Sequence, residues 1–238
     1  MFENINLTSY LFLDIETVPL VYNYEDLDEK KKKLFEKKVK YRLSEEIRPE
    51  DLYQEAGIWA EFGKIIVIST GFFVKNGEFR IKSFASHNEK KLLQDFAKLL
   101  NSDYFQRKDL KLCAHNGKEF DFPYIARRMI INRISLPKQL QMHGKKPWET
   151  PFCDTMELWR FGDYKHYTSL ELLTDILGIP SPKIDIEGKD VARVYYEEKD
   201  LKRITEYCER DVISVAQIIL RLAGKELLTA EKIVKVKN

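Results

Sequence analysis

The pattern of hydrophobic and polar positions predicts strands in the first third of the chain. Residues 10–19 (YLFLDIETVP) carry apolar side chains on both faces of an extended segment, which predicts a central strand buried on both sides. Residues 63–74 and 79–84 are rich in β-branched and aromatic residues, and the Asn76–Gly77 turn between them favours a β-hairpin.

Later segments change to helical spacing. Leucine and phenylalanine fall on one stripe over residues 88–100, and a similar apolar stripe marks residues 200–222. Residues 120–132 are predicted to form a further helix with Pro123 in its first turn. Residues 110–114 are a short apolar run typical of a strand, and residues 152–160 have the pattern of a strand end that passes into a helix. Strands that alternate with helices predict an α/β fold, with a mixed sheet covered by helices.

A capping box predicts one further helix. Thr168 and Glu171 have the required spacing, so a helix is expected to follow Thr168 and to reach Leu177, where Gly178 stops it. Residues 179–190 are rich in Pro, Gly and Ser and predict a loop.

Residues 21–57 differ in character from the rest. Glu29 to Arg42 contains eight Lys or Arg residues and few apolar ones, which predicts one or two exposed helices inserted after the first strand. The cluster Lys30–Lys33 is first of all an exposed helix face, and a nucleic-acid contact is the second interpretation.

Composition sets broad limits. The chain has 238 residues, a length that one domain accommodates, and its 44% of hydrophobic residues is ordinary for a globular core. Charged residues make up 33%, yet the net charge is only +2. A balance this even neither indicates nor excludes a nucleic-acid partner, because an acidic metal site and a basic substrate surface cancel in the sum.

Cysteine content and hydropathy favour a cytoplasmic protein. Cys113, Cys153 and Cys208 are an odd number and include no C-x-x-C pair, so a disulfide framework or structural zinc site is not expected. The apolar run before Asp14 is too short for a signal peptide, and no stretch is long enough to span a membrane.

The candidate chemistry begins with Asp14 and Glu16. Residues two apart on a strand share a face, so both carboxylates are within reach of one ion. Burying them side by side costs several kcal/mol unless a cation compensates, and Mg²⁺ prefers such oxygens. The alternative is a strand end that reaches solvent.

Three later residues add to this candidate site, each with an ordinary alternative. Asp121 begins the second helix, where an aspartate is often an N-cap. Tyr207 and Asp211 are four apart on the last helix and therefore share a face. An inward Asp211 also fits a structural ion pair with Arg203 or Arg210.

In this order the signals resemble the three motifs of the DEDDy family of 3′–5′ exonucleases: D-x-E, then N-x3-F-D about 100 residues later, then Y-x3-D. The closer likeness is to the proofreading domain of family-B DNA polymerases and its stand-alone predicted exonuclease relatives. The segments that carry it are LFLDIETVP, CAHNGKEFDFPYIARR, CDTMELWR, SLELLTDILGI and EYCERDVISVAQIILRL. They cover most of residues 10–222, except the insertion. A related subgroup has His where this chain has Glu206, so the tyrosine version is favoured.

The resemblance implies a ribonuclease H-like fold, with a mixed five-stranded sheet flanked by helices, and one exonuclease domain over residues 1–238. It implies two Mg²⁺ or Mn²⁺ ions for two-metal phosphodiester hydrolysis, in which nucleoside monophosphates leave the 3′ end. Asp14, Glu16, Asp121 and Asp211 are the expected ligands. Tyr207 is expected to orient the attacking water, because a phenol with a pKa near 10 is a poor base at neutral pH.

Substrate contacts are also implied by the resemblance. Asn116 and Phe120 are expected to hold the terminal nucleotides, and the backbone at Thr17 and Val18 to meet the 3′ end. Asn116 also fits a turn residue, and Phe120 a packing residue. His115 is more typical of a packed or capping histidine than of a ligand. The lysines at 138, 145 and 146 lie in a loop that fits either phosphate contact or plain solvation.

Three functions compete with a single-stranded DNA exonuclease, which is the favoured one. A 3′–5′ exoribonuclease would use the same site, and the lack of a clear RNA-binding segment tilts the expectation toward DNA. An inactive nucleic-acid-binding module would have lost a carboxylate or Tyr207, and all five residues are present. A hydrolase of another phosphodiester would act on mononucleotide esters and not on oligonucleotides. Protein partners are not readable from the sequence.

Overall fold

The computed structural model describes residues 5–163, 165–180 and 186–236. These residues form one six-stranded sheet in the order β5-β4-β1-β2-β3-β6. The strands are β1 Tyr10–Pro19, β2 Gly63–Phe73, β3 Phe79–Ala85, β4 Lys111–Ala114, β5 Phe152–Asp154 and β6 Ile233–Lys235. β1 lies antiparallel to β2 and parallel to β4. The predicted central strand and the β2–β3 hairpin are confirmed.

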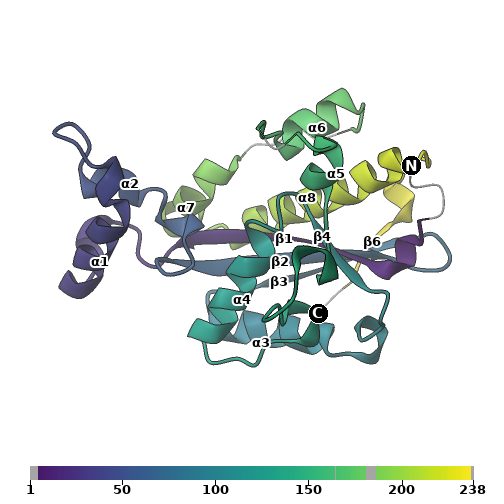
Figure 1. Cartoon of the computed structure of the whole chain (residues 1–238), viewed down its shortest axis with the longest axis horizontal. Helices are drawn as coiled ribbons and strands as arrows, with labels where there is room; N and C mark the ends of the chain where they lie inside the picture. The colour runs from purple at the N-terminus through teal and green to yellow at the C-terminus, as the bar shows by residue number, and fades with distance from the viewer. Residues whose placement is uncertain (1–4, 164, 181–185, 237–238) are drawn as a thin grey trace.

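Helices cover both faces of the sheet (Figure 1), with α5, α6, α7 and α8 on one side and α3 and α4 on the other. Their bounds are α1 Glu29–Val39, α2 Pro49–Tyr53, α3 Glu89–Leu100, α4 Asp121–Ile131, α5 Thr155–Arg160, α6 Leu170–Ile176, α7 Val191–Arg193 and α8 Leu201–Leu222. A π-helical turn at Val194–Glu198 follows α7. No helix of the described ranges is long and apolar enough to cross a membrane.

The alternation along β1 divides the core between these two faces. Leu11 and Leu13 pack with the buried side chains of α3 and α4, whereas Phe12 packs with Val212 and Val215 of α8. Successive side chains of a strand point to opposite faces. Asp14 and Glu16 therefore continue the Phe12 side and point toward α8.

The pairing of β1 with β2 is irregular next to Glu16, on the face of the sheet that α8 covers. Glu16 pairs with Val67, but the following residue, Thr17, pairs with Ile65. Ile66 is thus an extra residue in β2, a β-bulge that turns two successive side chains the same way. Ile66 and Val67 accordingly belong to one buried cluster with Cys208 of α8, which fills the space beside the predicted site.

The insertion after β1 is more than a charged surface helix. Phe35 and Val39 of α1 are fully buried against Tyr53 of α2, and the Tyr53 hydroxyl donates to the carbonyl of Val21 at 3.1 Å. The prediction of one or two helices in this insertion is confirmed, but α1 and α2 share a small core of their own and are not fully exposed. In Figure 1 they project from one end of the sheet.

Three details differ from the sequence-based expectations. The sheet has six strands where five were expected, because β6 pairs with β3. Ser169, not Thr168, caps α6 and accepts the Leu172 N–H at 3.2 Å; two adjacent cap-forming residues made the choice ambiguous. The predicted loop 179–190 ends in a short helical turn before α7, and its residues 181–185 lie outside the described ranges.

Candidate active site

Asp14 and Glu16 meet α8 in the interior of the protein. The Cys208 thiol of α8 donates to Oδ2 of Asp14 at 3.2 Å. One ligand atom from each of Asp14, Glu16 and Cys208 lies within 4.8 Å of the others. Glu16 is only 7% exposed, so a solvated strand end does not fit Glu16, whereas Asp14 is partly exposed and reaches an open cleft.

Asp121 reaches the same place from the other direction. It is the first residue of α4, and the N-cap position is occupied by Phe120. The Asp121 carboxylate accepts the backbone N–H of Ile15, the residue between Asp14 and Glu16. Its Oδ1 atom is buried and has no hydrogen-bond partner among the described residues. The geometry therefore favours a ligand role over a simple helix cap.

Tyr207 and Asp211 complete the group from α8. The Tyr207 hydroxyl donates a hydrogen bond to the Asp211 carboxylate, which lowers the pKa of that carboxylate. The Arg210 guanidinium lies 6.0 Å from the Tyr207 ring centre and acts on Asp211 in the same direction. Arg203, the other expected partner, forms an ion pair with Glu198 at 2.7 Å.

Burial and crowding perturb these acids strongly. Burial raises the pKa of Asp14 and of Glu16 well above the usual range, and repulsion from neighbouring carboxylates adds to it. Burial raises the pKa of Asp121 to about 7 and that of Asp211 to about 6. Burial and then the nearby carboxylates raise the pKa of Tyr207, so its hydroxyl stays protonated. Without a compensating cation the group resists full ionisation at neutral pH.

This chemistry fits a divalent metal site. Four carboxylates converge from three segments, and an orphaned oxygen of Asp121 faces no protein donor in the described part of the chain. Hard cations such as Mg²⁺ and Mn²⁺ prefer oxygen ligands of this kind. The Cys208 thiol is the one softer group beside them, and burial raises its pKa far above the ordinary range, which keeps it a neutral thiol.

The loop between β4 and α4 positions Asp121. The Asp154 carboxylate accepts the backbone N–H groups of Asn116 at 2.9 Å and of Lys118 at 3.0 Å. Asn116 has a left-handed φ of 60°. A Cβ on Gly117 would lie 2.4 Å from the Cβ of Ala114, so the loop requires glycine at this position.

His115 makes the contacts of a packed histidine, which the sequence favoured, and it also lies with Asp14 in the wall of a cleft. Its Nδ1 contacts the Thr155 hydroxyl at 2.9 Å and its Nε2 contacts the Thr168 carbonyl at 2.8 Å. Burial lowers the pKa of His115, so the ring is neutral near pH 7. It links the loop after β4 to α5 and to the segment before α6.

A cleft of about 850 Å³ opens over the candidate site between α6 and α8. Asp14, Tyr207 and Asp211 lie in its wall, together with Glu171 and Asp175 of the α6 region. Sequence reasoning missed the α6 contribution, although the SLELLTDILGI segment was noted as part of the resemblance. The exposed Tyr167 and Leu172, which also line the cleft, are the apolar part of this wall.

None of the four expected substrate-binding residues is among the described residues that line this cleft. Val18 is fully buried, and the Thr17 side chain hydrogen-bonds Tyr124. The Phe120 ring lies 5.3 Å from that of Tyr124, which fits the packing role. The Asn116 Oδ1 is buried without a partner in the described residues. Their contacts with substrate stay predictions.

Comparison with known proteins defines the class of this fold and site. The chain resembles a structure of the family B DNA polymerase from the hyperthermophilic archaeon Pyrobaculum calidifontis, with a TM-score of 0.53 and 14% identity. The match covers 90% of this chain but 24% of the polymerase, so this chain spans about a quarter of that protein. The fold is the ribonuclease H-like fold of exonuclease domains.

The family follows from the sequence. A family described as predicted 3′–5′ exonucleases related to the exonuclease domain of PolB matches residues 58–233, and the chain belongs to this family. Asp14 and Glu16 precede the matched segment. One chain of the structure of the yeast NOT1 MIF4G domain co-crystallised with CAF1 also matches, with a TM-score of 0.45, 13% identity, and coverage of 95% of this chain and 84% of that one. A search of the curated proteins finds no match.

Proposed function

We propose that the chain is a metal-dependent 3′–5′ exonuclease that releases nucleoside monophosphates from single-stranded nucleic acid, with DNA the favoured substrate. The observation that carries this proposal is the group of mutually repelling carboxylates of Asp14, Glu16, Asp121 and Asp211, with an unpartnered buried oxygen on Asp121. Membership of a family of predicted 3′–5′ exonucleases supports the same reaction class.

The four carboxylates are the proposed holders of two Mg²⁺ or Mn²⁺ ions. When bound, such ions activate water as a nucleophile and stabilise the leaving 3′ oxygen. The protein supplies the arrangement: β1 fixes Asp14 and Glu16 on one face, α4 brings Asp121 to the β1 backbone, and α8 brings Asp211. The carboxylates repel one another when no metal is bound, and bound cations would offset this repulsion.

Tyr207 is the proposed orienting residue. Its hydroxyl remains protonated because burial raises its pKa, and it already donates to Asp211. A protonated phenol beside the ligands holds a water or a phosphate oxygen in line but does not remove its proton. Asn116 and Phe120, and the backbone at Thr17 and Val18, are proposed to bind the terminal nucleotides.

One domain over residues 1–238 and a cytoplasmic location complete the proposal. The continuous sheet and its shared cores support a single domain, and the three free cysteines fit a reducing compartment. An exoribonuclease with the same site is the second candidate, because nothing in the described cleft distinguishes deoxyribose from ribose.

The test is digestion of a 5′-labelled single-stranded DNA oligonucleotide and its RNA counterpart, with Mg²⁺, Mn²⁺ or EDTA. A ladder that shortens from the 3′ end only with metal supports the proposal, and the faster substrate identifies the sugar. Asp14→Ala should abolish the ladder, whereas Asp175→Ala, which removes an exposed acid of the same cleft, should retain it. Binding of oligonucleotides without any cleavage favours the inactive module; cleavage of mononucleotide esters alone favours a different hydrolase.

A further inference from the structure

The described wall of the cleft over the candidate site includes no Lys or Arg that could hold a nucleic-acid backbone. It carries Glu171, Asp175 and Glu187 in addition to Asp14 and Asp211. Bound metal ions would offset the charge at the reacting phosphate. Positive groups outside this described wall are therefore candidates to hold the phosphates further along a bound strand, because backbone neutralisation supplies most of the affinity for nucleic acid.

A basic cavity lies at the opposite end of the parallel strands. It has a volume of about 470 Å³, and its wall contains five cationic side chains against the two carboxylates of Asp109 and Glu149. The cations are Arg107, Lys108, Lys111, Lys138 and Lys145. Lys111 begins β4 and pairs with Tyr10, whereas the candidate site follows the other end of β4. About 10 Å of strand separates the two ends.

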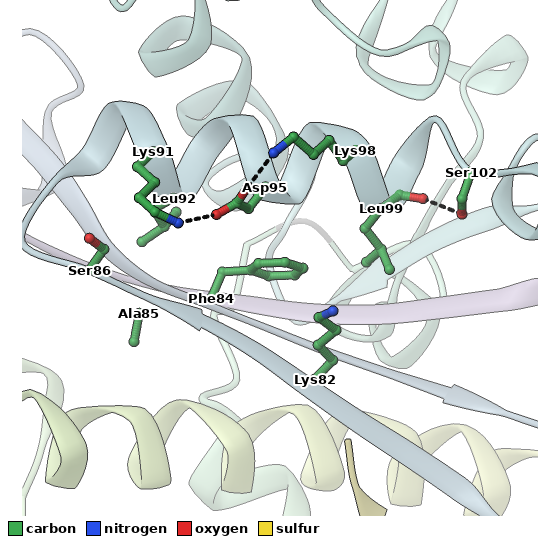
Figure 2. Close-up of a pocket in the computed structure, with 10 residues that line it drawn as sticks. All are labelled: Lys82, Phe84, Ala85, Ser86, Lys91, Leu92, Asp95, Lys98, Leu99 and Ser102. Carbon is green, nitrogen blue, oxygen red and sulfur yellow. Dashed lines mark hydrogen bonds and ion pairs between the residues drawn. The ribbon is translucent and has the colours of Figure 1, made fainter. Parts of the chain in front are cut away.

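These lysines are available for phosphates. Across residues 5–163, 165–180 and 186–236, the ammonium groups of Lys108, Lys138 and Lys145 form no ion pair. The larger cavity between β3 and α3 differs in this respect (Figure 2). There Lys91 and Lys98 both pair with Asp95, at 2.9 and 2.8 Å, so their charges are already offset.

An apolar hollow adjoins the basic cavity. It has a volume of about 230 Å³ and shares Thr150 with the basic cavity, and Lys118, in the loop before α4, is also among the residues that line it. Lys118 follows Asn116 in the loop after β4. The Phe152 ring of edge strand β5 forms part of the wall and stacks on Phe122, with ring centres 4.2 Å apart. A flat apolar wall of this kind accepts nucleobases.

We propose that this edge of the molecule, from Lys118 past Phe152 to Lys138 and Lys145, binds the 5′-ward part of the single strand whose 3′ end is cleaved. We call it the β5-edge track. Its parts match the needs of a strand, with an apolar surface that includes Phe152 and lysines that are free to contact phosphates. The position of the 3′ end at the carboxylates rests on the proposed exonuclease function. The binding of a single strand by the β5-edge track does not depend on that function.

The test compares two charge-reversal variants on exposed lysines. Lys138→Glu/Lys145→Glu alters the track, and Lys91→Glu/Lys98→Glu alters the paired lysines of Figure 2 as a matched control. Binding is measured by fluorescence anisotropy with single-stranded oligonucleotides of increasing length, in EDTA so that no strand is cut. Circular dichroism verifies that both variants are folded.

We expect the track variant to weaken binding of a long oligonucleotide about tenfold and to reduce the salt slope by about 1.4, as the loss of two phosphate contacts implies. The control should change little. With Mg²⁺, the track variant should lose kcat/KM on long strands but retain it on the shortest substrate that is cleaved. Equal losses in both variants, or unchanged binding in the track variant, overturn the track. Track-dependent binding in a wild-type protein that cleaves nothing overturns the proposed function alone.

Discussion

The carboxylate of Asp154, at the end of β5, accepts the backbone N–H of Asn116 at 2.9 Å across the strand boundary. The same carboxylate accepts the Lys118 N–H at 3.0 Å and caps α5 through the Met156 N–H, also at 3.0 Å. One buried acid therefore fixes both the loop that leads to Asp121 and the helix that follows β5.

Asp154→Ala should lower both stability and activity. The substitution leaves several buried N–H groups without an acceptor, and hydrogen bonds to charged groups contribute about 1.5–3 kcal/mol each. We expect the free energy of unfolding to fall by about 3 kcal/mol in urea titrations. In the folded variant, cleavage should fall because Asn116 and Asp121 lose their fixed positions.

Asp154→Asn is the variant to compare with Asp154→Ala, because the amide oxygen of asparagine can still accept some of these backbone N–H groups. It should lie between wild type and alanine in stability and in kcat/KM. Equal stability of all three proteins would show that solvent replaces the carboxylate, and the positioning role would then be wrong.

The metal-free protein should lose stability as pH rises. Burial raises the pKa of Asp121 to about 7 and of Asp211 to about 6, above the ordinary 3.8. From about pH 3.8 up to the folded-state pKa values, the folded chain retains protons that the unfolded chain has lost. The free energy of unfolding therefore falls as pH rises through the folded-state pKa values. In EDTA, Tm should therefore be lower at pH 8 than at pH 5.5.

Added Mg²⁺ or Mn²⁺ should reverse this trend. Ligand carboxylates must be deprotonated to bind metal, so the gain in Tm on adding metal should be larger at pH 8 than at pH 5.5. At about a hundredfold excess over Kd the gain is about 2.7 kcal/mol, or several degrees. Asp121→Asn should remove most of the metal response. If this variant gained as much in Tm on adding metal as the wild type does, the ions would bind at a site that does not include Asp121.

Tyr207→Phe should reduce kcat about 100-fold with little effect on KM, since the hydroxyl is proposed to orient the reacting groups. The hydrogen bond from Tyr207 also lowers the pKa of Asp211, so the acidic limb of the pH–rate profile should move to higher pH in the variant. Tyr22→Phe is the control, because its hydroxyl donates to Glu197 at 2.7 Å in an exposed position. A normal rate in Tyr207→Phe would exclude the orienting role.

Elements with a strong hydrophobic period could be predicted from the sequence. β1 and α8 had unbroken patterns, and both carry residues of the candidate site. The β-bulge at Ile66 could not be predicted, because Ile65, Ile66 and Val67 are all apolar and the pattern does not reveal which face each one takes. The buried Phe35 was also missed, since the many lysines around it suggested a fully solvated helix.

The carboxylates could be predicted as a set, but their surroundings could not. Spacing places Asp14 with Glu16 and Tyr207 with Asp211, whereas the convergence of β1, α4 and α8 depends on tertiary packing. The acidic cleft wall comes from α6, which has no local signal for a site.

A buried ion pair behind the site should contribute strongly to stability. The Arg128 guanidinium of α4 contacts the Glu89 carboxylate of α3, and these side chains are 6% and 9% exposed. Glu89 also accepts the backbone N–H of Ile65 at 2.8 Å, next to the bulge in β2. Arg128 donates to the carbonyl of Ala60 at 2.8 Å. The pair thus connects both helices to the strand that supports Glu16.

Arg128→Met should lower the free energy of unfolding by about 3–5 kcal/mol, because it leaves the Glu89 carboxylate buried without its cation. Urea titration measures this, with Lys91→Met as the control; that lysine forms an exposed pair and should contribute less than about 1 kcal/mol. The double variant Arg128→Met/Glu89→Met should recover part of the loss, since it removes the stranded charge as well. If the double variant is less stable than Arg128→Met, Glu89 acts mainly by holding the Ile65 N–H, and the β2 bulge beside Glu16 depends on that acceptor rather than on the ion pair.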